Sequence, residues 1–195
     1  MIHFIRFAFV LACVLSVVSG EAAAHAPDGS VGGGFYAGFM HPFGGIDHLL
    51  ATLAVGAWIA RLGRRAVVVV PFAVLAALGL GFAVGYAGVW IPAESGIVAS
   101  LLALAAGLLF DLRPLPIVAA VAAGFFAFFH GHAHGTEIPA ASEWAGFAAG
   151  LAAASVALMI SGGVLSRMIG ACGAWRRDKP EAPCRRDFEA IQRLK

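Results

Sequence analysis

Two short segments of the chain concentrate side chains that can bind metal ions. The first, HPFGGIDH, covers residues 41–48, and the second, HGHAHGTE, covers residues 130–137. Both lie within apolar sequence, where an ionisable side chain is costly and therefore indicates a function. Imidazole and carboxylate ligands without a neighbouring cysteine favour a borderline divalent cation such as nickel, cobalt, iron or zinc over copper(I).

The spacing of the second segment permits two geometries. On a continuous helix His130, His134 and Glu137 occupy positions i, i+4 and i+7 and form one stripe, with His132 on the opposite side. If the two glycines of the segment let the chain run extended, the three histidines point the same way instead. The sequence leaves both geometries open.

The first segment predicts a broken helix. Pro42 has no N–H and cannot bond the carbonyl four residues earlier, and Gly44 and Gly45 lower the cost of unwinding. A second half-helix would begin directly afterwards, and its positive end would favour an ionised Asp47. On an unbroken helix the two histidines of this segment share a face, with the aspartate about 100° away. A break could bring all three together.

The composition defines the class of protein in which these segments act. The chain has 195 residues, of which 61% are hydrophobic and 12% charged, and its mean hydropathy is +0.88. Soluble domains carry about 45–50% apolar and about 25% charged residues. This composition excludes a water-soluble globular enzyme, a disordered chain and a nucleic-acid-binding protein. It predicts an all-α fold, a polytopic bundle of transmembrane helices.

The order of residue types divides the chain into four regions. Residues 1–24 have the basic, apolar and small-residue order of a secretory signal peptide, with an uncleaved first span as the alternative. An external linker over residues 25–34, a transmembrane domain over residues 35–172 and a charged cytoplasmic tail over residues 173–195 follow. About five spans are expected, over residues 35–60, 66–93, 94–110, 114–135 and 144–166.

The basic residues orient these spans. Outside the signal segment every Lys and Arg falls between residues 61 and 65, at Arg113, or in residues 167–195. With an external N-terminus these three places are all cytoplasmic, as the positive-inside rule requires. An uncleaved signal gives the same orientation. His25 in the linker and Glu94 at the external start of the third span then lie on the same side as the second segment, and both are candidate ligands.

The two segments, together with residues 54–56, 62–65 and 92–95, closely resemble the HupE/UreJ family of small bacterial inner-membrane proteins associated with hydrogenase and urease gene clusters. The resemblance runs from about residue 34 to residue 163. It implies a multi-pass permease of the inner membrane that supplies nickel or cobalt to the cytoplasm, without an organic cofactor. Proteins that mature nickel enzymes are then expected partners, and self-association is left open. The metal role is carried over to His41, Asp47, His48, His130, His132, His134 and Glu137.

Two features depart from the family's pattern. Met159 stands in the fifth span where family members usually have a histidine, and a thioether is a softer and weaker ligand for nickel. From Arg176 the chain becomes polar, where members usually carry a further apolar helix.

The leading hypothesis is a transporter and not an enzyme. Hydrated Ni²⁺ would be collected by His130, His134 and Glu137 and passed to His41, Asp47 and His48, driven by the membrane potential or a proton gradient. Because imidazole binds metals only when neutral, uptake is expected to fall below about pH 6.5. The alternatives are a membrane metalloenzyme that uses the same ligands and a haem-binding electron-transfer anchor.

Overall fold

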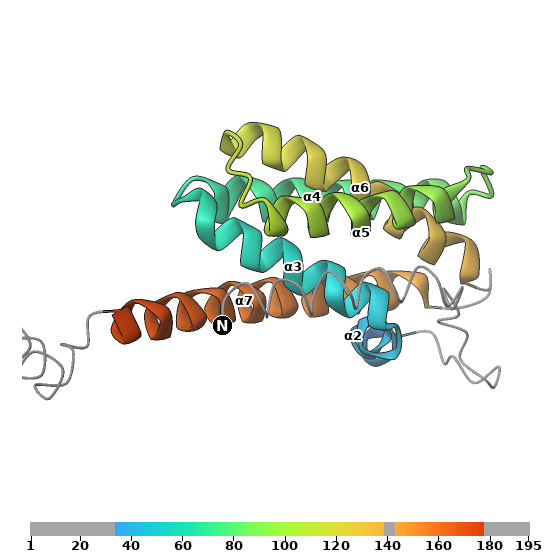
Figure 1. Ribbon diagram of the computed structural model, residues 1–195. Helices are drawn as coiled ribbons and strands as arrows, with labels where there is room; N and C mark the ends of the chain where they lie inside the picture. The colour runs from blue at the N-terminus through green and yellow to red at the C-terminus, as the bar shows by residue number, and fades with distance from the viewer. Residues whose placement is uncertain (1–33, 139–142, 178–195) are drawn as a thin grey trace, which may run out of the picture.

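The protein folds into α-helices throughout the part of the chain that the structure describes (Figure 1). The computed structural model describes residues 34–138 and 143–177, without the side chains of residues 46, 47 and 171–177. The predicted signal peptide, His25 and the end of the predicted tail lie outside these residues. The helices are α2 (Phe35–Gly44), α3 (Ile46–Leu62), α4 (Ala66–Tyr86), α5 (Ala93–Leu109), α6 (Pro116–Glu137) and α7 (Trp144–Arg177). The predicted all-α fold is confirmed for the described residues.

Among the described residues, three helices are long and apolar enough to cross a bilayer, namely α4, α6 and the Trp144–Gly170 part of α7. The pair α2 and α3 meets the same criterion when counted as one broken span. With 17 residues α5 is shorter; at a rise of 1.5 Å per residue it extends about 25 Å, against a hydrocarbon core of about 30 Å. Large apolar side chains such as Phe72 and Val121 are 75% and 68% exposed, which suits helices that face lipid.

The predicted helix break is present, and it lies at Gly45, the C-terminal end of the segment in which it is predicted. The helix α2 continues through the buried Pro42 to Gly44, and the chain then becomes extended at Gly45, with φ −113° and ψ 119°. The axes of α2 and α3 differ by 86° across this break. In Figure 1 α2 is accordingly seen end-on while α3 runs along the bundle. The broken segment therefore places its two histidines on differently directed helices.

Close glycine contacts hold α4 against α6. Added Cβ atoms on Gly81 and Gly85 of α4 would overlap the backbone of α6, and Cβ atoms on Gly131 and Gly135 of α6 would overlap the backbone of α4. Such reciprocal contacts let two helix backbones approach closely, so that van der Waals packing replaces the hydrophobic drive that lipid does not provide.

A second group of glycines packs α7 against both halves of the broken span. A Cβ on Gly38 of α2 would overlap the carbonyl group of Phe147, and one on Gly56 of α3 would overlap that of Met159. From the other side, Gly150 and Gly162 of α7 have no room for a Cβ against α2 and α3. The bundle therefore contains two closely packed groups, α4 with α6, and α7 with α2 and α3.

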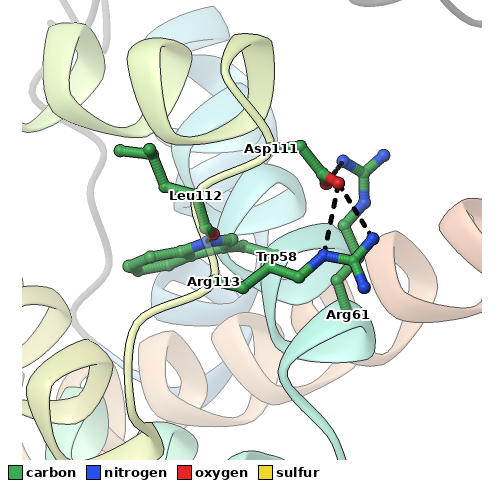
Figure 2. A network of polar contacts seen from close by, with 5 residues as sticks. All are labelled: Trp58, Arg61, Asp111, Leu112 and Arg113. Atoms are coloured by element: carbon green, nitrogen blue, oxygen red, sulfur yellow. Dashed lines mark hydrogen bonds and ion pairs between the residues drawn. The ribbon is translucent and has the colours of Figure 1, made fainter.

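A polar network joins the end of α3 to the connection between α5 and α6 (Figure 2). The indole N–H of Trp58 donates to the carbonyl oxygen of Leu112 over 2.8 Å. Asp111, which has a positive φ of 52°, pairs with Arg61 at 3.0 Å and with Arg113 at 2.8 Å. This network fixes the end of α3 that lies opposite His48.

Candidate metal centre

The second motif lies on an unbroken helix, which decides between its two predicted geometries. Because α6 continues to Glu137, His130, His134 and Glu137 share one stripe and His132 lies on another side. His130 and His134 are 9% and 2% exposed, whereas Glu137 is exposed at the helix end.

The glycines of this motif serve helix packing. A Cβ on Gly131 would overlap the carbonyl group of Leu78, and one on Gly135 would overlap the carbonyl oxygen of Phe82. Both contacts are with α4. Because Gly131 and Gly135 turn toward α4, the stripe that carries His130 and His134 is directed to a different neighbour.

That neighbour is the broken span. The ring centroids of His41 and His134 are 4.5 Å apart, and those of His48 and His134 are 4.7 Å apart. The ring centroids of His48 and His130 are 5.2 Å apart, and those of His41 and His48 are 5.9 Å apart. Four imidazoles, two from each motif, thus form one cluster, which we call the histidine cluster: His41, His48, His130 and His134.

One edge of the cluster has the donor set of a metal site. Ligand atoms of His41, His134 and Glu137 all lie within 4.8 Å of one another. Three donors about 2.1 Å from a shared ion in tetrahedral geometry are about 3.4 Å apart, so each separation would have to contract by at most about 1.4 Å for all three to bind one ion. Two imidazoles and one carboxylate suit a borderline divalent metal. The Nδ1 atom of the buried His134 has no hydrogen-bond partner among the described residues, which leaves it available to such an ion.

A small cavity of about 70 Å³ adjoins the cluster on its inner side. This exceeds the roughly 10–15 Å³ that a cavity needs to hold a water molecule. Its walls combine polar and apolar side chains. The polar or polarisable residues that line it are His48, Thr52, Ser100, His130, His134 and Met159.

The structure groups the candidate metal ligands differently from the two successive binding sites that the sequence predicts. The outer set joins His41 of the first motif with His134 and Glu137 of the second, and the inner contact joins His48 with His130. The predicted order, with one motif collecting the ion and the other receiving it, stays a prediction, but the two motifs lie side by side. The break at Gly45 brings the histidines of the first motif next to those of the second.

His132 lies outside the histidine cluster. Its Nε2 is 2.7 Å from the carbonyl oxygen of Val89, in the connection after α4. A carbonyl oxygen only accepts, so His132 donates this hydrogen bond. The contact anchors α6 to the end of α4, which favours a structural role for His132.

Other predicted ligands are not gathered at the cluster. Glu94 is exposed in the first turn of α5, where a carboxylate stabilises the positive end of a helix, and it belongs to neither the described ligand group nor the cavity wall. Asp47 is the second residue of α3, but its side chain is outside the described part. Conversely, Ser100 lines the cavity and was not predicted. A hydroxyl in an otherwise apolar run is its one sequence signal.

The fold and the cluster define a helical protein of membrane-spanning dimensions that gathers imidazoles from separate helices into its interior. The chain belongs to the HupE / UreJ protein family, whose sequence pattern matches residues 12–180. It is 38% identical to Protein HupE of Rhizobium leguminosarum bv. viciae over 161 residues, which cover 82% of this chain and 84% of that protein. No solved structure matches the chain. The family resemblance seen in the two motifs is confirmed.

Proposed function

We propose that this protein is a permease that carries a divalent transition metal, with nickel the first candidate and cobalt the second, into the cytoplasm for the maturation of hydrogenase or urease. One observation carries the proposal: ligand atoms of His41, His134 and Glu137 converge within 4.8 Å at the edge of a cluster of four imidazoles. Membership of the HupE / UreJ family supports the proposal, because hydrogenase and urease, with which the family is associated, use nickel.

The arrangement suits conduction better than storage. Conduction requires sites that bind firmly enough to remove water from the ion and weakly enough to release it. The exposed Glu137 attracts the hydrated cation, His41 and His134 replace part of its water, and His48 and His130 receive it next to the small cavity. Because the imidazole rings are neighbours, the ion can pass from one to the next in short steps. The membrane potential favours inward movement of a cation.

The size of the cavity also bears on the alternatives. Pockets for organic ligands usually measure about 300–1,000 Å³, several times the roughly 70 Å³ beside the histidines. This favours a small ion over the macrocycle that a haem anchor would hold. A membrane metalloenzyme has no specific observation in its favour among the described residues.

The same substitution at two histidines of one motif tests the proposal. His134→Gln removes a member of the cluster, so nickel accumulation in cells should fall to the level of cells without the protein. His132→Gln retains a donor for the Val89 carbonyl and should leave accumulation near that of the wild type. Accumulation is measured with radioactive nickel at equal amounts of membrane-inserted protein. Equal accumulation in the wild type and His134→Gln would remove the proposal.

A further inference from the structure

Ser100 is a buried hydroxyl in the middle of α5 with two polar neighbours. Its Oγ is 2.6 Å from the carbonyl oxygen of Ile97 and 3.0 Å from Nε2 of His130, and the residue is 1% exposed. A hydroxyl has one hydrogen to donate and can also accept. Because a carbonyl oxygen only accepts, a separation of 2.6 Å requires the Ser100 hydrogen to lie between these two oxygens. The hydroxyl therefore donates to Ile97.

The other contact of Ser100 then has a defined direction. With its hydrogen committed to Ile97, the Ser100 oxygen accepts from His130, so Nε2 of His130 carries the hydrogen. A neutral imidazole carries one hydrogen, which leaves the lone pair of His130 on Nδ1. A metal ion binds an imidazole through such a lone pair. We infer that Ser100 is a positioning residue that holds His130 in its Nε2–H form and makes Nδ1 its metal-binding nitrogen.

The location of Ser100 gives this hydrogen bond a consequence for the proposed ion path. Ser100 and His130 line the same cavity, together with His48 and His134, and the rings of His48 and His130 are in contact. A hydrogen bond to the second nitrogen of a metal-binding histidine fixes both its tautomer and its ring orientation. The helix α5 thus contributes to the cation site by orienting an imidazole of α6. The consequence of this inference for transport rests on the proposed function. The position of the proton on His130 does not depend on it.

The tautomer is tested directly on the metal-free protein. Nitrogen NMR spectra of purified protein labelled at histidine should show His130 with its proton on Nε2, the signals being assigned by their loss in His130→Asn. In Ser100→Ala this preference should be lost, because Nε2 no longer has its acceptor. A wild-type His130 with its proton on Nδ1 would overturn the inference, whether or not the protein transports nickel.

Nickel binding to the same purified proteins tests the consequence. Ser100→Ala should weaken nickel binding about tenfold or more, the usual effect of losing a group that orients a ligand. Ser100→Thr keeps the hydroxyl and should restore binding. Ser155→Ala is the matched control, since Ser155 is also buried on a helix, donates to the Leu151 carbonyl and lies in α7; the affinity of this variant should equal that of the wild type.

The outcomes separate this inference from the proposed function. Should the wild type bind nickel and lose it in His134→Gln but not in Ser100→Ala, the inference about Ser100 is wrong and the proposed function stands. Should the wild type bind no nickel while His130 has the Nε2–H form, the proposed function is wrong and the tautomer assignment stands. Equal losses in Ser100→Ala and Ser155→Ala would mean that packing, and not the His130 contact, is responsible, and would overturn the inference.

Discussion

At the scale of single residues, the histidine cluster separates side chains that the sequence alone treats alike. His132 and His134 belong to one motif, yet His134 contacts two further imidazoles and His132 bonds the Val89 carbonyl. Likewise Glu137 is a member of the candidate metal-ligand group, whereas Glu94 lies at the start of α5. Residue type and position in a motif are thus insufficient to assign a ligand.

The two glutamates give a matched test of this distinction. Glu137→Gln keeps the size of the side chain but removes the negative charge and the stronger donor, so nickel affinity should fall about tenfold or more. Glu94→Gln should leave affinity unchanged. Isothermal titration calorimetry on the purified variants measures both. A larger loss in Glu94→Gln than in Glu137→Gln would contradict the placement of the site.

Met159 is the residue at which the cavity wall departs from the family's usual histidine. It is 5% exposed and lines the same cavity as His48, His130 and His134. Met159→His should add an imidazole to this wall and tighten nickel binding about tenfold, equivalent to about 1.4 kcal/mol, while slowing release to the cytoplasm.

Met159→Leu is the control for that change, because it conserves volume and removes the sulfur. It should bind nickel as the wild type does if the thioether is no ligand. Affinity by calorimetry and uptake rate are measured together. Unchanged affinity in Met159→His would show that this part of the cavity is not on the path of the ion.

At the scale of helices, glycines determine which side chains meet. Gly131 and Gly135 turn one side of α6 toward α4, and this directs the other stripe to the broken span. Gly38 and Gly56 seat α2 and α3 on α7, which fixes where His41 and His48 lie. The cluster is therefore a consequence of two glycine-mediated packings.

Local features of this arrangement could be predicted from the sequence. Pro42 followed by two glycines predicts the break, and the spacing of His130 and His134 predicts a shared stripe if the helix continues. The meeting of the two motifs could not be predicted, because it depends on the 86° bend and on the faces that α4 and α7 cover. The role of Ser100 could not be predicted either, because a single hydroxyl has no spacing pattern and its partner His130 is 30 residues away in the sequence.

A pair of alanine substitutions tests the role of these glycines. Gly131→Ala introduces a Cβ into the backbone of α4, so it should destabilise the protein by about 1–3 kcal/mol and weaken nickel binding. Gly79→Ala lies on α4 with nothing within 4 Å of the added Cβ, and should be neutral or slightly stabilising because alanine favours helix.

Thermal unfolding of the purified variants in detergent measures this difference. Gly131→Ala should unfold at a lower temperature than the wild type, and Gly79→Ala should not. Equal unfolding temperatures for the two variants would contradict the close packing of α4 on α6.

At the scale of the whole molecule, the connections that carry basic residues lie at one end. In Figure 1 the connection from α3 to α4, the connection from α5 to α6 and the end of α7 share one end of the bundle, and the connection from α4 to α5 lies at the other. The ion pair between Arg61 and Asp111 joins the first two. By the positive-inside rule we propose that this basic end faces the cytoplasm and that the end with the histidine cluster faces the outside.

Cysteine labelling tests that orientation. In a variant with the native cysteines replaced by serine, Trp90→Cys, at a position 84% exposed in the connection after α4, should react with a membrane-impermeant maleimide added to intact spheroplasts. Arg64→Cys, also exposed, should react only after lysis. The reverse pattern would contradict the orientation and, with it, the inward path.

The central claim is that the histidine cluster conducts a divalent metal, and flux through the purified protein tests it most directly. Wild-type protein in liposomes that enclose a nickel-quenched dye should admit Ni²⁺ faster than protein-free liposomes, and an inside-negative potential should increase the rate. His134→Gln should reduce the rate to that of protein-free liposomes. Wild-type flux no greater than that of protein-free liposomes, or His134→Gln flux equal to that of the wild type, would contradict the claim.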